Sequence, residues 1–142
     1  MKTVINGKHS GSEVQFSTAL ADSANGLIYI SETDAPIEPF FRSIAKNDIQ
    51  SNIAEMVGRL PSEQPEIVSF DRFFERLITD QKCNDNEQSR GVQRFRELKT
   101  LLEENLTDLQ VARFGKTRID IYVVGFDQDG NLAGITTRAV ET

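Results

Sequence analysis

The stretch "TRIDIYVVGFDQDGNLAGITTRAVET", residues 117–142, decides the fold of this chain. Apolar and polar side chains alternate along its first part, which is the pattern of a strand with one buried face. One face carries Ile119, Ile121 and Val123, and the other carries Arg118, Asp120 and Tyr122. Asp129-Gly130 then separates this run from a second strand-like run, "LAGITTRAV", and Asp-Gly in such a position is a strong hairpin signal. The sequence therefore predicts a C-terminal β-hairpin.

Two helices are predicted in the first half of the chain. The stretch "SEVQFSTALADSANG" (12–26) opens with a capping box, in which Ser12 is followed three residues later by Gln15. The stretch "DIQSNIAEMVGRLP" (48–61) has apolar residues at helical spacing, Asp48 to cap its start and a proline to end it.

Helical spacing recurs more clearly in the middle of the chain. The stretch "SFDRFFERLI" (69–78) places apolar residues at i, i+3, i+4, i+7 and i+8, and a second apolar face runs from Val92 to Leu106. The polar segments "SEQPE" (62–66) and "TDQKCNDNEQS" (79–89) that flank the first of these helices predict surface loops.

Further strands are predicted on either side of these helices. The stretch "LIYISETDAP" (27–36) begins with a short apolar run and predicts a buried strand. The next stretch, "IEPFFRSI" (37–44), contains Pro39, which confines it to a sheet edge or an irregular piece. The stretch "QVARFG" (110–115) is a third candidate. Early helices, a short early strand and a late hairpin together indicate an α+β layered sandwich.

Composition places the chain among globular proteins of one domain. It has 142 residues, of which 38% are hydrophobic and 27% charged, so we expect a single domain over 1–142 with a flexible lead-in over 1–11. Sixteen basic and twenty-two acidic side chains give a net charge of −6. Such a charge repels nucleic acid and anionic membranes and attracts basic partners, although moderate acidity also serves solubility alone. No stretch has the length of a signal peptide's apolar core or a membrane span, so we expect a cytoplasmic protein.

Residue counts exclude several kinds of chemistry. Cys83 is the only cysteine and His9 the only histidine, which excludes an intrachain disulfide, a multi-cysteine metal site and a histidine-rich zinc site. An EF-hand loop counted from Asp127 has its glycine at position 4 and Arg138 at position 12, so the calcium motif fails and a hairpin turn explains these residues. No nucleophile lies beside a base, and we expect neither enzymatic activity nor a bound cofactor.

Two polar patches follow directly on apolar runs. In the first, the run "LIYI" is followed by Ser31 and then by Glu32, Thr33 and Asp34; in the second, Glu141 and Thr142 end the chain with its α-carboxylate. Carboxylate and hydroxyl oxygens are the ligands that hard cations such as Mg²⁺ accept. Each patch taken alone is also compatible with a solvated strand end.

At these patches the sequence resembles the nuclease A inhibitor family, the inhibitors of a cyanobacterial sugar-nonspecific nuclease. The similarity lies in "NGLIYISETDAPIEPF", in "FDRFFERL" and above all in "RIDIYVVGFDQDGNLAGITTRAVET". It covers most of the chain from about Asn25 onward, whereas residues 43–65 depart from the family pattern.

The resemblance implies a three-layer α-β-α sandwich like the pathogenesis-related protein 1 fold, with a mainly antiparallel sheet. It also implies a non-catalytic protein that covers the active-site cleft of a DNA/RNA-nonspecific ββα-metal endonuclease. In the family a glutamate of a Ser-Glu-Ser-type turn and the C-terminal threonine reach the nuclease's catalytic Mg²⁺, and these positions fall on Glu32 and Thr142. The metal would belong to the partner, with no nucleic acid or membrane bound directly. We expect a monomer that forms a 1:1 complex, and a free C-terminus because a tail would block Thr142.

One feature of the family is altered in this sequence. An Asp-Trp pair before the family's long helix aligns with Lys82 and Cys83, so a cation replaces an anion and a large aromatic residue is lost. Aromatic residues often dominate interface energies, and we therefore expect Lys82 and Cys83 to change the choice of partner. A variable segment with no role is the alternative for this loop.

Two other functions stay open at this point. One is a non-catalytic adaptor of the same fold with a partner that is not a nuclease, since a fold does not fix a function. The other, ranked lower, is a metal-dependent hydrolase that uses the acidic residues.

Overall fold

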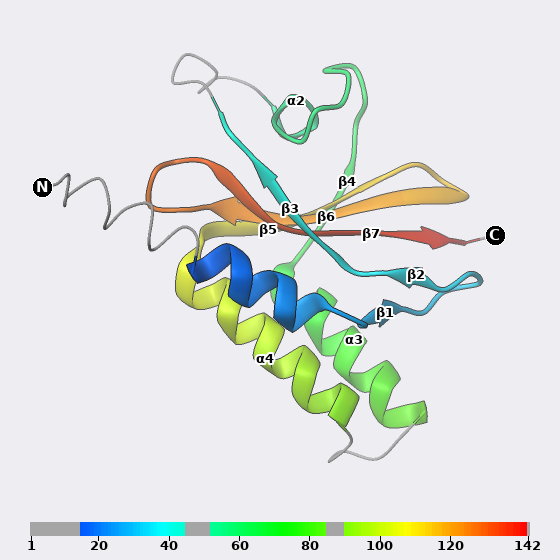
Figure 1. Cartoon of the computed structure of the whole chain (residues 1–142). Coiled ribbons are helices and arrows are strands. Elements are labelled where there is room, and N and C mark those ends of the chain that lie inside the picture. Colours follow the sequence, from blue (N-terminus) through cyan, green and yellow to red (C-terminus); the bar gives the residue numbers. More distant parts are fainter. Residues whose placement is uncertain (1–14, 45–51, 85–89, 142) are drawn as a thin grey trace, which may run out of the picture.

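The computed structural model describes residues 15–44, 52–84 and 90–141 (Figure 1). A helix described over 15–24 comes first. It is followed in chain order by β1 (Ile28–Tyr29), β2 (Ala35–Pro36), β3 (Glu38–Arg42), α2 (Ile53–Met56), β4 (Glu66–Val68), α3 (Phe70–Asn84), α4 (Arg90–Asn105), β5 (Thr107–Phe114), β6 (Arg118–Phe126) and β7 (Leu132–Val140).

The main sheet has five antiparallel strands in the order β3-β7-β6-β5-β4. β6 and β7 form the C-terminal hairpin that the alternating pattern predicts, with pairs from Arg118–Val140 to Phe126–Leu132. The carboxylate of Asp127 closes the turn by accepting the N–H groups of Asp129 (2.9 Å) and Asn131 (3.0 Å). An aspartate at position 127 therefore stabilises the turn that contains Gly130. This confirms the prediction that Asp127 belongs to a hairpin turn.

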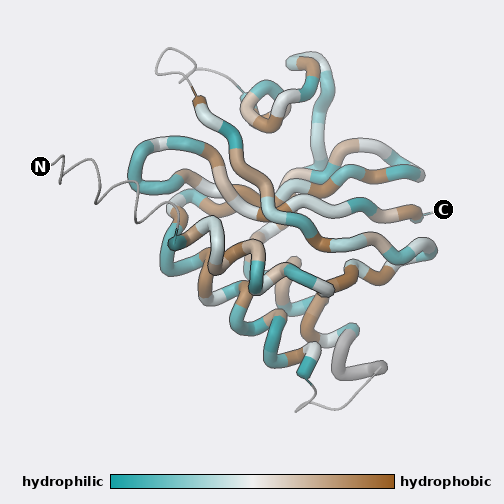
Figure 2. The backbone as a smooth tube through the Cα atoms, in the orientation of Figure 1, coloured by the Kyte–Doolittle hydropathy of each residue, from teal (hydrophilic) through white to brown (hydrophobic). Residues whose placement is uncertain are grey.

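One face of the sheet is covered by the helix over 15–24, α3 and α4, which Figure 1 shows together below the strands. Apolar and hydrophilic segments alternate along these helices (Figure 2), as amphipathic helices require. Their apolar residues join those of the sheet face that the sequence predicts to be buried. This core includes the buried side chains of Leu20, Phe70, Phe73, Phe74, Phe95, Leu98, Leu102, Ile121 and Ile135.

The opposite face of the sheet carries a smaller core beneath α2. Ala54 and Val57 pack there with Phe114, Val124 and Leu132. In the described part of the chain, α2 is the helix on this side, and it consists of a single turn (Figure 1).

A second, two-stranded sheet consists of β1 and β2 and lies beside the C-terminal half of β7 (Figure 1). β3 pairs with β7 only from Leu132 to Thr136. Beyond that point the β1–β2 hairpin takes the place of β3, and the hydroxyl of Thr137 donates to the carbonyl of Pro36 at 2.9 Å. The β1–β2 hairpin therefore contacts β7, but neither of its strands belongs to the main sheet.

The α+β class, the mainly antiparallel sheet and the edge position of the strand with Pro39 are confirmed. The likeness to pathogenesis-related protein 1, with a full three-layer sandwich, stays a prediction. The strand predicted at the apolar run 27–30 exists as β1, but it is shorter than expected and not fully buried, because β1 has two residues and Ile28 and Ile30 remain 39% and 44% exposed. Alternation turns only Leu27 and Tyr29 toward the core.

The helix predicted over 48–61 is wrong in its extent. The described α2 is capped by Asn52, whose side chain accepts the N–H of Glu55 at 3.0 Å; Asp48 lies outside the described residues. α2 ends because Gly58 adopts a φ of 91°, a left-handed conformation that commonly terminates helices. Leu60, assigned to its apolar face, is 67% exposed.

Both predicted loops need correction. The loop over 62–66 runs into β4, which begins at Glu66 and was missed because three residues carry too little pattern. The loop over 79–89 is wrong at its start, since α3 continues to Asn84. The stretch 85–89, the lead-in over 1–11 and the Ser12 cap lie outside the described residues.

Candidate functional site

The turn that contains Glu32 joins β1 to β2 and is organised by one hydroxyl. Ser31 Oγ donates to the carbonyl of Thr33 at 2.7 Å and accepts the Thr33 N–H at 3.3 Å. Serine hydroxyls form such local turns because the short side chain reaches the backbone two residues later. Glu32, Thr33 and Asp34 are exposed at the tip of this hairpin.

The same turn lies against the end of β7. The N–H of Glu32 donates to the carbonyl of Val140 at 3.3 Å, and the N–H of Val140 donates to Ser31 Oγ at 3.1 Å. Ser31 and Val140 are 109 residues apart in the sequence. The structure thus brings the first predicted polar patch beside the backbone that leads into the second. Thr142 itself lies outside the described residues.

Glu141 is held from two sides. Its N–H donates to the carbonyl of Thr117 at 2.9 Å, and its carboxylate pairs with the guanidinium of Arg113. Arg113 also binds Glu66 across the β4–β5 pair, with 3.1 Å between Nη1 and Oε1. The hydrogen bond with Glu141 raises the pKa of Arg113, so this guanidinium is a permanent cation. The segment that follows β7 therefore starts from a fixed position.

An open groove of about 860 Å³ adjoins these residues. It is lined by residues of α3 and by Glu32, Glu141 and the end of β7. Among the residues that line it, Tyr29 stacks on Phe73, with ring centroids 5.9 Å apart and 5° between the planes. Burial of the Tyr29 phenol raises its pKa. The groove thus combines an aromatic pair with charged side chains, and protein-binding surfaces commonly contain both kinds of residue.

Lys82 and Cys83 belong to the last turn of α3, not to a loop. Their side chains lie outside the described residues, but Thr79 and Asp80, on the preceding turn, line the groove together with Glu32. The backbone of α3 therefore leads along the groove toward these two positions.

Sequence reasoning missed Ser31, Arg113 and Glu66 as parts of this site. Ser31 had a usable signal, since serine directly before Glu32 can organise a turn. Arg113 and Glu66 had none, because their contacts with each other and with Glu141 depend on strand pairing between distant segments.

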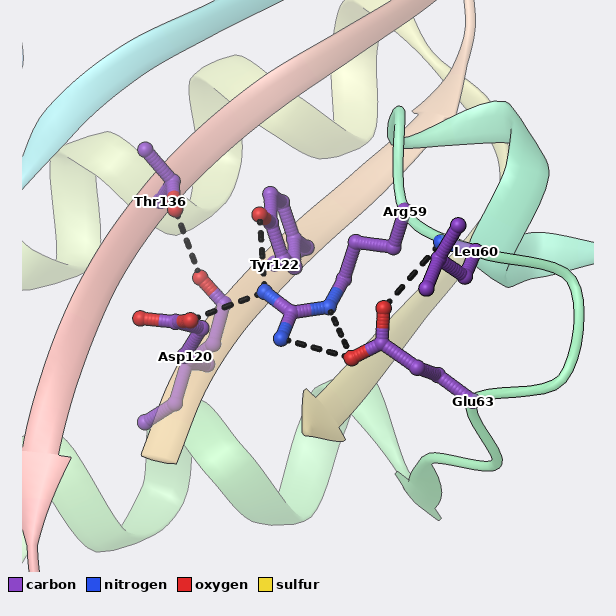
Figure 3. Close-up of polar contacts among 7 residues, drawn as sticks. Arg59, Leu60, Glu63, Asp120, Tyr122 and Thr136 are labelled. Carbon is purple, nitrogen blue, oxygen red and sulfur yellow. Dashed lines mark hydrogen bonds and ion pairs between the residues drawn. The ribbon is translucent and has the colours of Figure 1, made fainter. Parts of the chain in front are cut away.

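A second polar cluster lies on the opposite face of the sheet (Figure 3). Arg59 contacts Glu63 (Nη2–Oε1, 2.8 Å), Asp120 (Nη1–Oδ2, 2.8 Å) and the hydroxyl of Tyr122 (3.5 Å), and its guanidinium carbon lies 4.7 Å from the centre of the Phe114 ring. Desolvation of the guanidinium is outweighed by these hydrogen bonds, which raise the pKa of Arg59. The cluster ties the segment after α2 to β6, and we assign it a structural role.

Among the described residues no group of three or more histidine, cysteine, aspartate or glutamate side chains has the arrangement of a metal site. The same residues include no helix that is long and apolar enough to span a membrane.

The fold and these two adjoining patches define a small α+β protein with a candidate binding surface at the end of β7. A family model described as nuclease A inhibitor-like protein matches residues 14–142, and the chain belongs to this family. A search of curated proteins gives no match. Membership in an inhibitor-like family implies a non-catalytic protein whose partner is a nuclease.

Proposed function

We propose that this protein inhibits a sugar-nonspecific endonuclease of the ββα-metal type by covering its active-site cleft as a 1:1 complex. The observation that carries the proposal is the pair of hydrogen bonds between the Glu32 turn and Val140. They hold the turn that carries the exposed Glu32 side chain beside the backbone that continues to Thr142. Two residues that contact one metal ion must lie close to each other, and this arrangement brings their segments together.

The proposed chemistry uses oxygen ligands of this chain and a cation of the partner. Mg²⁺ binds proteins through one or two carboxylates and keeps several waters, so Glu32 and the hydroxyl of Thr142 can approach it directly or through water. A phosphodiester-cleaving cleft is electropositive, and a protein of net charge −6 is attracted to it over long range. In this proposal the inhibitor's acids occupy the place of the substrate's phosphates, and no nucleic acid is bound.

We propose that the other predicted site residues contact the nuclease around Glu32 and Thr142. Thr33 and Asp34 belong to the same exposed turn as Glu32, and Glu141 precedes Thr142. Lys82 and Cys83 follow the groove-lining part of α3, and we propose that they adjust the choice of nuclease. The positive charge of Lys82 calls for a partner surface different from one that accepts an aspartate.

Inhibition of such an endonuclease in Mg²⁺ buffer tests the proposal. Glu32→Gln and Thr142→Ala should each raise the inhibition constant at least tenfold, which corresponds to about 1.4 kcal/mol. Glu97→Gln is the matched control, because it makes the same charge change at an exposed position of α4. We expect it to change the inhibition constant less than twofold.

Binding with and without metal separates metal contact from general charge attraction. With Mg²⁺ removed, Glu32→Gln should bind the nuclease nearly as well as the wild type does. Failure of the folded wild type to inhibit several nucleases of this type would contradict the proposal and favour an adaptor with another partner.

A further inference from the structure

The hairpin that carries Glu32 is joined to β7 by two side-chain hydroxyls. Thr137 binds the carbonyl of Pro36 at the base of the hairpin, and Ser31 binds the N–H of Val140 near its tip. The position of Glu32 relative to the end of β7 therefore depends on single side chains more than on a continuous strand ladder.

Ser31 uses the full hydrogen-bonding capacity of its hydroxyl. A hydroxyl has one donor and two acceptor sites. Ser31 Oγ donates to the Thr33 carbonyl (2.7 Å) and accepts the N–H groups of Thr33 (3.3 Å) and Val140 (3.1 Å). One atom thus fixes the shape of the turn and its attachment to β7 at once.

We propose that Ser31 is a positioning residue, whose hydroxyl holds the Glu32 turn on the end of β7 so that both metal-directed segments meet the nuclease already aligned. The inference rests on the proposed function. Without the hydroxyl, the turn loses an internal brace and one of its two bonds to Val140, although Glu32 keeps its N–H bond to the Val140 carbonyl. The complex must then restore this alignment, and ordering a loosened segment reduces affinity.

A purely structural role for Ser31 is the competing explanation, and Thr137 provides the matched control. Thr137→Val also removes one hydroxyl that joins the hairpin to β7, but at a buried position away from the Glu32 turn. Both substitutions should lower the melting temperature. Only the change at Ser31 should act on the alignment of Glu32.

The test measures the inhibition constant and the melting temperature of four proteins. We expect Ser31→Ala to raise the inhibition constant about tenfold relative to the wild type. Ser31→Thr keeps the hydroxyl and should stay within about threefold of the wild type. Thr137→Val should also stay within about threefold, even where its melting temperature falls as far as that of Ser31→Ala.

Two further measurements connect the effect to Glu32 and to Val140. In a Glu32→Gln background, Ser31→Ala should change the inhibition constant less than twofold, because no carboxylate remains to be aligned. Amide hydrogen exchange at Val140 should become at least tenfold faster in Ser31→Ala than in the wild type.

The possible failures are distinguishable. A folded wild type that does not inhibit would overturn the proposed function and this inference together. A wild type that inhibits, with Ser31→Ala either unchanged or no weaker than Thr137→Val, would overturn the positioning role alone. A full tenfold effect of Ser31→Ala in the Glu32→Gln background would also overturn it.

Discussion

Replacement of Gly134 by alanine should disrupt the pairing of β7 with its neighbouring strands in the main sheet. Gly134 is buried in β7 between Phe40 of β3 and Val124 of β6. A Cβ atom built there lies 1.8 Å from the backbone carbonyl oxygen of Val123. Non-bonded heavy atoms prefer a separation of about 3.5–4 Å, so one strand would have to move by roughly 1.7 Å.

The cost of this movement can be worked out from the ladder. N–H···O bonds that start near 2.9 Å are lost by such a displacement. Two lost bonds at about 1 kcal/mol each, with about 1–3 kcal/mol of overpacking strain, give a destabilisation of about 3–5 kcal/mol. Domains have a total stability of about 5–15 kcal/mol. If the wild type lies at the lower end of this range, the variant should be barely folded.

Urea denaturation measures this cost directly. With a slope of about 2 kcal/mol/M, the midpoint of Gly134→Ala should fall by about 1.5–2.5 M. Gly130→Ala is the control: nothing lies within 4 Å of its added Cβ, and its φ of 80° alone should cost about 1 kcal/mol. A loss below 1 kcal/mol for Gly134→Ala, or an equal loss in both variants, would refute the reasoning.

Two titratable groups give further predictions. Hydrogen bonds from Arg59 lower the pKa of Glu63, so this carboxylate stabilises the fold above the usual glutamate pKa of about 4.3. That stability is lost as pH falls through the lowered pKa of the folded state. The difference in urea midpoint between the wild type and Glu63→Gln should therefore disappear in acid. A difference that stays constant with pH would contradict a stabilising contact between Arg59 and Glu63. Burial raises the pKa of Tyr29, one of two tyrosines. In Tyr122→Phe, an absorbance titration of the folded protein should give a midpoint above about 10, and stability from Tyr29 should decline as pH rises through it. A midpoint at or below that of the urea-unfolded chain would count against burial.

Local patterns predicted the elements that pack their own periodic face into the core. The alternation around Ile121 predicted β6, and the spacing of Phe70, Phe73 and Phe74 predicted α3. The end of α3 was not predictable in this way, because Thr79 and Asp80 are polar or charged and remain exposed while the helix continues. Gly58, by contrast, was a visible stop signal for α2 that the apolar spacing through Leu60 concealed.

The composition of the candidate site was predictable, but its assembly was not. Glu32 and Glu141 were recognised as polar residues at the ends of apolar runs. Their proximity depends on bonds of Ser31 and Glu32 to Val140, which leave no trace in local sequence patterns. Resemblance to a family supplied the expectation that these two distant segments act together.

The strand order has a consequence for folding of the chain during its synthesis. β7 lies between β3 and β6, yet β4, β5 and β6 are all synthesised before it. On the ribosome, β3 and the hairpin that carries Glu32 must therefore wait for β7 before they can dock, and such long-range pairing is slow to form. We expect the nascent chain to acquire its binding surface only once β7 is available for pairing, in the same step that completes the sheet.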